Sequence, residues 1–327
     1  MHWFSRTLAA AMVLLATPAS LAIESTDSAA KAPIRQIAVT IDDLPWATLG
    51  DATPATLAQY HPRLIVAMKE AAIPLIGFVN EGKLVSGDKV DTSRVHLLKD
   101  WVDAGFDLGN HSYSHADLHA VGLEAYESDI LRGEVFLRPL LAERNKKPEW
   151  FRHPYLRAGR TVEDKAALQA FLAEHGYRIA PVTVDTSDWV WAGAYRKAIA
   201  AGDTASMTRL RDDYVPYMVS KVDYFEDQSI QLLGYNLPQI LLMHANEINA
   251  DTFGQLVAAI RARGYEFITL EAAMKDPAYQ RADAYLGKWG PSWIHRWATG
   301  EGRPKEFYAG EPVTPAWVLA MAGIDSE

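Results

Sequence analysis

Segments typical of buried β-strands alternate with amphipathic helices along most of this chain, and this alternation restricts the fold more than any other feature. Strands are predicted over residues 37–41, 74–79, 106–109, 149–152, 177–182, 239–243 and 265–268. Helices are predicted over residues 56–72, 92–104, 123–143, 161–175 and 252–263, with two or three more between 191 and 233. The pattern predicts an α/β fold with a parallel sheet, either open or closed into a barrel.

Polar side chains gather just after the predicted strands. They are Asp42, His111, Arg152, Asp185, Asp188 and His244, and they follow the ends of different strands. In a closed βα barrel the carboxyl ends of the strands meet at one mouth. In an open sheet they spread along a crevice, and fewer of these side chains could meet. The placement therefore favours a barrel with a functional site at that end.

Two histidines in this set have the spacing of metal ligands. His111 and His115 are four residues apart, so a helical turn here would place both imidazoles on one face. Asp42 and Asp43, at the end of the first strand, offer a carboxylate as a third ligand. Two imidazoles, one carboxylate and one open position are typical of a catalytic zinc site. The spacing leaves open which aspartate binds, because successive side chains leave a strand in opposite directions.

The remaining residues supply proton transfer. A bound metal lowers the pKa of its water to about 7, and the aspartate that is not a ligand can accept the proton of that water. His244 has the pKa range of a general acid, and Asp188 can orient it. Arg152 can pair with Asp42, and backbone N–H groups around Tyr155 can bind an oxyanion. Each motif taken alone also fits an ordinary structural role, so the hypothesis depends on their combination.

The amino terminus predicts where the protein is located, and the composition excludes some partners and some chemistry. Residues 1–22 have a basic start, a short apolar stretch and small residues before Ala22, which predicts a cleaved signal peptide; a retained anchor is the alternative. Residues 23–33 are predicted to be a disordered leader. We expect export, to the periplasm, with no stable membrane insertion. The net charge of −9 argues against nucleic acid as a partner, and the absence of cysteine excludes disulfides and thiol catalysis.

Five segments together resemble the five motifs of the polysaccharide deacetylase family, the NodB-homology domain of carbohydrate esterase family 4. They are Thr40-Ile41-Asp42-Asp43, His111-Ser112-Tyr113-Ser114-His115, Arg152-His153-Pro154-Tyr155, Asp185-Thr186-Ser187-Asp188-Trp189 and Leu242-Met243-His244. The resemblance covers residues 34–270. It implies a distorted (β/α)7-8 barrel over residues 34–275, with residues 190–238 as an insertion and residues 276–327 as a tryptophan-rich extension packed on the barrel.

The resemblance also implies roles. Asp43, His111 and His115 would bind Zn²⁺, or Co²⁺ or another divalent cation. Asp42 would be the catalytic base and His244 the acid, with Arg152 tuning Asp42 and Asp188 tuning His244. Trp189 and Leu242 would line the acetyl pocket, beside the oxyanion contact at Tyr155.

Three features depart from the family pattern. Leu44-Pro45-Trp46 follows the paired aspartates where the family usually has glycine, and Leu156 follows Tyr155 where glycine is common. We expect this bulk to reshape the cleft. The long insertion could cover the site.

In the extension, Trp289, Trp293 and Trp297 are spaced by four, which predicts one helix face that packs on the barrel, with a sugar platform as the alternative.

The predicted function is deacetylation of an N-acetylated glycan, of the chitooligosaccharide or peptidoglycan type, to a free amine and acetate. Two alternatives stay open: an esterase that removes O-acetyl groups from xylan-like glycans, and an inactive glycan-binding barrel. A glycosidase with paired carboxylates is disfavoured, because adjacent aspartates cannot flank a glycosidic bond at the roughly 5 Å or more that is required. No G-x-S-x-G elbow and no dinucleotide fingerprint occur. The oligomeric state is not predicted.

Overall fold

The computed structural model describes residues 1–3, 35–47 and 52–326. The predicted leader and all but the first three residues of the predicted signal peptide lie outside this part of the chain. Ile34–Glu327 form one compact unit. Within the described residues, no helix combines the length and the apolar character needed to cross a bilayer.

The core of this unit is a parallel sheet, and each of its strands overlaps one of the seven predicted strands. The strands are β1 (Arg35–Leu44), β2 (Leu75–Val79), β5 (Asp107–Asn110), β6 (Trp150–Phe151), β7 (Arg178–Ile179), β8 (Gln239–His244) and β9 (Tyr265–Phe267). Their order is β7-β6-β5-β2-β1-β8, and β9 also pairs with β1. A separate antiparallel hairpin joins β3 (Val85–Ser86) to β4 (Lys89–Val90), which the sequence pattern did not predict.

The chain just after β7 connects the two edges of this sheet. β7 pairs with β6 at one edge, and a few residues later the N–H groups of Thr183 and Val184 donate to the carbonyl of Ile240 in β8, both at 3.0 Å. Leu242 N–H donates in turn to the carbonyl of Val184 at 3.1 Å. The sheet therefore curls until the segment that follows β7, at one edge, meets β8 at the opposite edge. The predicted fold class, an α/β chain whose parallel sheet curls into a distorted barrel, is confirmed.

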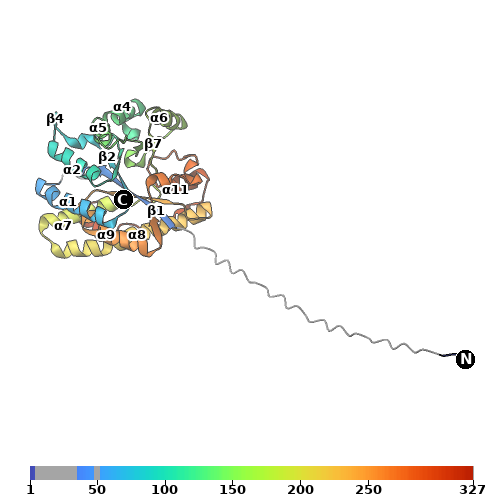
Figure 1. Ribbon diagram of the computed structural model, residues 1–327. Coiled ribbons are helices and arrows are strands. Elements are labelled where there is room, and N and C mark those ends of the chain that lie inside the picture. The colour runs from blue at the N-terminus through green and yellow to red at the C-terminus, as the bar shows by residue number, and fades with distance from the viewer. Residues whose placement is uncertain (4–34, 48–51, 327) are drawn as a thin grey trace. The chain divides into compact units, whose positions relative to one another are not determined.

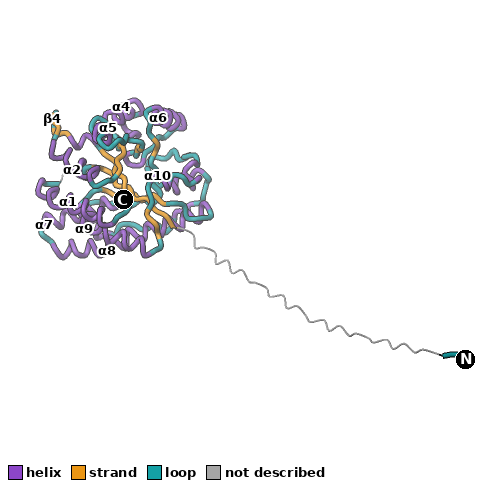
Figure 2. The backbone as a smooth tube through the Cα atoms, in the orientation of Figure 1, coloured by secondary structure: helices purple, strands orange, loops and turns teal. Residues whose placement is uncertain are grey.

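Helices surround the strands (Figure 2). They are α1 (Pro54–Ala71), α2 (Thr92–Asp103), α3 (Leu118–Val121), α4 (Leu123–Arg132), α5 (Leu137–Ala142), α6 (Val162–Glu174), α7 (Asp188–Ala201), α8 (Thr204–Leu233), α9 (Glu247–Ala262), α10 (Leu270–Ala273), α11 (Trp293–Gly300) and α12 (Ala316–Ala322), with short 3₁₀ turns at Glu81–Leu84, Pro154–Leu156, Pro277–Gln280 and Lys305–Tyr308. Figure 1 shows α7, α8 and α9 along one side of the strands and α4, α5 and α6 along the other. Most of the insertion is therefore helical, and α7 contacts α8, α9 and the carboxyl-terminal α12.

The single helix predicted over residues 123–143 is wrong, because the chain breaks it into α4 and α5. A Cβ atom on Gly133 would lie 2.7 Å from the backbone carbon of Ser112, so the chain passes too close to the histidine segment for a larger residue. The carboxylate of Glu81 then accepts the N–H groups of Phe136 and Leu137, which begins α5. The break therefore lies where the chain contacts the histidine segment.

The tryptophans of the extension do not share one helix face. Trp293 and Trp297 lie in α11 and are buried, at 7% and 2% exposed. Trp289 precedes the helix and is 61% exposed. Four-residue spacing implies one face only inside a helix, and α11 begins at Trp293. Packing is therefore the role of Trp293 and Trp297, whereas Trp289 faces solvent.

The seam of the barrel yields a stability prediction. The Thr183 hydroxyl oxygen is buried and accepts the N–H of Ile240 at 2.7 Å. Thr183→Val keeps the shape but leaves this N–H without its acceptor, which should lower the free energy of unfolding by about 1–3 kcal/mol. Urea unfolding measures the change. Thr92→Val, at an exposed position in α2, is the control and should change it by less than about 0.5 kcal/mol. Equal effects of the two variants would contradict the role of Thr183 in closure.

Candidate metal centre and acid-base site

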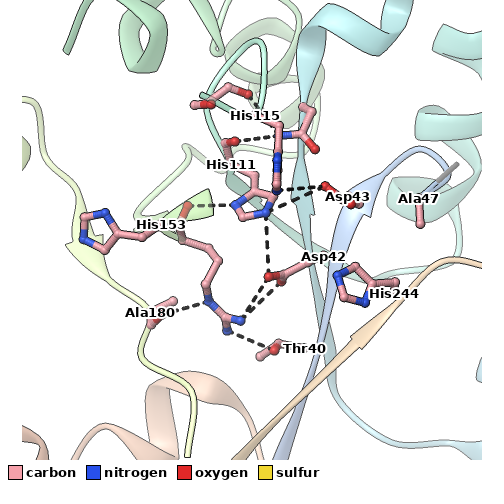
Figure 3. A network of polar contacts seen from close by, with 12 residues as sticks. Thr40, Asp42, Asp43, Ala47, His111, His115, His153, Ala180 and His244 are labelled. Carbon is pink, nitrogen blue, oxygen red and sulfur yellow. Dashed lines mark hydrogen bonds and ion pairs between the residues drawn. The ribbon is translucent and has the colours of Figure 1, made fainter. Parts of the chain in front are cut away.

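The two adjacent aspartates at the end of β1 face the same side. Asp42 pairs in register with His244 of β8, as expected for a regular strand. The pairing of β1 with β2 then shifts between Ile41 and Leu44, and Asp43 takes a left-handed backbone with φ of 69°. This irregularity cancels the usual alternation of side chains. As a result, Asp42 Oδ2 and Asp43 Oδ1 both lie 3.8 Å from His111 Nε2 (Figure 3).

The histidine segment is a loop, so the condition under which four-residue spacing places both imidazoles on one helix face is not met. His111 follows β5 directly, and both Ser112 and His115 have positive φ values, 63° and 58°. The side chain of Asn110 accepts the N–H of Ser112 at 2.7 Å, and the Ser112 hydroxyl accepts the N–H of Ala116 at 3.2 Å. These bonds replace the helical ones. The loop still folds back so that the two imidazole centroids lie 4.9 Å apart.

Asp43, His111 and His115 form a group that can hold a metal ion. Their ligand atoms all lie within 4.8 Å of one another, and His115 Nε2 is 3.5 Å from Asp43 Oδ1. His111 Nδ1 donates to the carbonyl of Arg152 at 2.8 Å, which leaves the lone pair of Nε2 toward the group. Burial lowers the pKa of both histidines, which favours the neutral form that binds metal.

The charge of Asp43 completes this fit. Burial raises the pKa of Asp43, but the positive charges of Lys83 and His244 lower it by more, so its pKa falls below the ordinary value. Its Oδ1 is buried and accepts no hydrogen bond from the described residues, although Lys83 forms an ion pair with it. A carboxylate with two neutral imidazoles, one of them oriented by a backbone carbonyl, suits a divalent cation.

The other aspartate is held by a buried arginine. Arg152 Nη1 lies 3.3 and 3.2 Å from the two oxygens of Asp42, and its remaining nitrogens donate to the Ala180 carbonyl at 2.8 Å and to Thr40 Oγ1 at 2.9 Å. Burial raises the pKa of Asp42, and Arg152 and His244 oppose this rise only in part. The pKa of Asp42 is therefore about 6, which suits a general base near neutral pH.

His244 is paired with Asp188, the first residue of α7. Its Nδ1 lies 2.6 Å from Asp188 Oδ1, and Asp188 Oδ2 accepts from the His244 N–H, Asn246 Nδ2 and Asn249 Nδ2 at 2.9, 3.1 and 2.9 Å. Burial lowers the pKa of His244, but Asp188 outweighs it and the pKa rises to about 9. At neutral pH this imidazole is protonated, as a general acid requires.

The residues predicted to contact substrate lie at different depths. Tyr155 and Trp189 are 53% and 47% exposed, whereas Leu242 is buried. The Tyr155 ring lies edge-on to His115, with centroids 4.4 Å apart. Leu44, Trp46 and Leu156, which we expected to reshape the cleft, are all buried in the main hydrophobic core. Their bulk is therefore packed inside the protein.

Four polar residues of this site were missed from the sequence. Lys83 Nζ donates to the carbonyls of Asp43 and Ala47 at 2.9 and 3.3 Å, and Asn80 Nδ2 donates to the carbonyl of His111 at 2.6 Å. Asn80 and Lys83 follow the carboxyl end of β2, so the rule that selected the other polar residues could have found them. Asn246 and Asn249, which bond to Asp188, likewise follow β8.

The fold and the site define an α/β-barrel protein with a potential metal centre at the carboxyl ends of its strands. The profile of the polysaccharide deacetylase family matches residues 29–178, which include the first three motifs. The resemblance inferred from the motifs is thereby confirmed.

Individual relatives are distant. A peptidoglycan-N-acetylglucosamine deacetylase of Bacillus cereus is 23% identical over 181 residues, which are 54% of this chain and 51% of the relative, so the match spans about half the length of that protein. A family 4 carbohydrate esterase of Streptomyces lividans, solved with acetate, is 18% identical with a TM-score of 0.45, over 74% of this chain and 97% of the other. A polysaccharide deacetylase of Bacillus cereus is 16% identical with a TM-score of 0.48, over 72% and 91%.

Metal binding can be tested without any substrate. His115→Ala removes one of three ligands and should lower the affinity for added Zn²⁺ or Co²⁺ by roughly 10²-fold or more. Calorimetric titration and elemental analysis measure the loss. His96→Ala, an exposed histidine in α2, is the matched control and should bind metal like the wild type. Full metal content in His115→Ala would show that the ion lies elsewhere.

Proposed function

We propose that this protein is a metal-dependent deacetylase that hydrolyses the acetamide of an N-acetylated glycan to a free amine and acetate. The observation that carries the proposal is the convergence of three groups at one end of the barrel. These are the Asp43, His111 and His115 cluster, the Asp42–Arg152 pair and the His244–Asp188 pair. They supply a cation site, a base and an acid within one buried network.

The cation site and the two pairs each have one role in the proposed reaction. A divalent cation, Zn²⁺ by the donor set and Co²⁺ as a substitute, would polarise the acetyl carbonyl and its bound water. Asp42 accepts the proton of the attacking water, and Arg152 fixes the direction of its carboxylate. His244 donates a proton to the departing nitrogen while Asp188 holds its ring. The backbone N–H of Tyr155 would stabilise the oxyanion.

The protonated state of His244 favours an amide substrate over an ester. An amine leaves a tetrahedral intermediate only after it gains a proton, whereas an alkoxide leaves more readily, so a strong acid aids amide cleavage more. The Bacillus cereus relative bears the name of a deacetylase of peptidoglycan N-acetylglucosamine, which supports a glycan of this type. The exposed rings of Tyr155 and Trp189 are suited to pack against sugar rings.

The proposed location follows from the sequence of the amino terminus. A signal peptide ending near Ala22 would send the chain to the periplasm, where glycans of the cell wall are accessible. The acidic net charge disfavours binding of nucleic acid or of an anionic glycan through bulk charge.

A screen for acetate release tests the activity. Purified protein loaded with Zn²⁺ or Co²⁺ should release acetate from N-acetylated chitooligosaccharides or peptidoglycan fragments faster than from acetylated xylan. Measured acetate with metal, and its loss with a chelator, would support the proposal. Release from xylan alone would identify an O-acetyl esterase. Protein that binds metal and glycan without any release would identify an inactive binding barrel.

The pH profile of kcat/KM tests the assignment of base and acid. Asp42 must be unprotonated, so the rate should rise as pH rises through its pKa, and His244 must be protonated, so the rate should fall as pH rises through its pKa. The values of about 6 and about 9 are upper limits for the pKa values that the rising and falling parts of the profile report, because a cation bound beside Asp42 and His244 lowers both pKa values.

Asp42→Asn should keep the metal and lose about 10²-fold or more in turnover. A full rate in Asp42→Asn would refute the assignment of the base.

A further inference from the structure

The turn that carries Tyr155 has an unusual backbone. Tyr155 and the following Leu156 both have left-handed φ values, 55° and 53°. For residues with a Cβ atom, such a conformation costs of order 1–3 kcal/mol each and persists only where the surroundings impose it. The family pattern often has glycine at the second position, which adopts this conformation without cost. Here something else must hold the turn.

One buried side chain of the extension contacts this turn. Arg296, in α11, is 1% exposed, and its Nη2 donates to the carbonyl of Leu156. The other guanidinium nitrogens stay within the extension: Nε donates to the carbonyl of Pro291 and Nη1 to the carboxylate of Asp283, both at 3.0 Å. A planar guanidinium with all its nitrogens engaged has little freedom to move. Arg296 thus ties the turn to the extension.

A second contact is independent of the arginine. Gly290 lies so close to the turn that a Cβ atom there would be 1.8 Å from the carbonyl oxygen of Tyr155 and 2.9 Å from the carbonyl carbon of Leu156. Any larger residue at this position would push one backbone away from the other. The extension therefore approaches the turn through a glycine and bonds to it through an arginine.

The Tyr155–Leu156 turn also contacts the candidate metal-binding cluster. The Tyr155 ring packs edge-on against the imidazole of His115, with centroids 4.4 Å apart. Tyr155 also lies only three residues after Arg152, the arginine that pairs with Asp42. A shift of this turn would move the Tyr155 backbone relative to the cation site, and a small displacement of an oxyanion donor is enough to slow a reaction.

We propose that Arg296 is a positioning residue that holds the left-handed Tyr155–Leu156 turn, so that the carboxyl-terminal extension completes the oxyanion site. This inference rests on the proposed function for its catalytic consequence. Its structural part, that the extension restrains the turn, stands without it.

The kinetic test compares Arg296→Met with a matched variant. Arg296→Met should lower kcat about 10- to 100-fold, because an oxyanion contact acts in the transition state. KM should change less than about threefold, and metal affinity should not change, since no metal ligand is altered. Arg296→Lys, which can still donate to Leu156, should recover part of the loss. Arg281→Met, which removes an exposed ion pair with Glu301 in the same extension, is the control and should keep the wild-type kcat.

Gly290→Ala is the second variant, and it leaves the Arg296 side chain itself unaltered. It should likewise lower kcat with nearly constant KM, because the added Cβ would displace the turn. All rates are compared at a temperature well below the melting transition of each variant. If Arg296→Met does not fold, Gly290→Ala decides the question. A normal kcat in a folded Gly290→Ala or Arg296→Met variant overturns the inference.

Hydrogen–deuterium exchange without substrate separates this inference from the proposed function. In both variants the peptide that spans residues 153–157 should exchange faster than in the wild type, while the peptide around residues 107–111 should not change. Unchanged exchange at 153–157 would overturn the inference even in an active enzyme. Faster exchange there, in a protein that releases no acetate from any substrate, would overturn the proposed function and leave the restraint of the turn established.

Discussion

The site depends on two consecutive carboxylates that face the same side of a strand. A regular β1 would direct Asp42 and Asp43 to opposite faces, and only one of them could approach His111. The register shift after Ile41 and the left-handed backbone of Asp43 remove this alternation. Lys83 bonds to the carbonyl of Asp43 and to that of Ala47, so the irregular backbone is held from the neighbouring segment after β2. Without this local departure from strand geometry, Asp42 and Asp43 could not both lie beside His111.

Two buried carboxylates so close together repel each other, and their surroundings separate their titration. Burial dominates at Asp42 and raises its pKa to about 6, whereas the positive charges of Lys83 and His244 outweigh burial at Asp43 and lower its pKa. Paired titratable groups whose environments push their pKa values apart are typical of groups with different chemical roles. Arg152 and Asp188 are the partners that shift the pKa values of Asp42 and His244. Each is fully buried, each is hydrogen-bonded to several partners, and each pairs with one of the two groups that we propose transfer a proton.

The sequence predicted the seven parallel strands and the residues at their carboxyl ends, because both depend on local patterns of apolar and polar residues. It did not predict what depends on contacts between distant segments. The helical turn at His111 and His115 fails because side chains of Asn110 and Ser112 take over its backbone hydrogen bonds. The helix over residues 123–143 breaks because Gly133 lies against that loop. The direction of Asp43 follows from a bulge that no periodicity reveals. The roles of the site residues were inferred from a resemblance, and they stay predictions until metal and activity are measured.

The distribution of the site along the chain bears on what counts as the catalytic unit. The family profile ends at residue 178, yet His244 and its partner Asp188 lie beyond it, on β8 and α7. The segment after β7 also closes the barrel against β8, the strand that carries His244, and it leads directly into Asp188. The extension then adds Arg296 and Gly290, which contact the turn beside His115. The part of the chain beyond the family profile therefore contributes both to barrel closure, through the segment after β7, and to the surroundings of the proposed site, through Arg296 and Gly290. The proposed active site depends on the packing of these later segments as well as on the first three motifs.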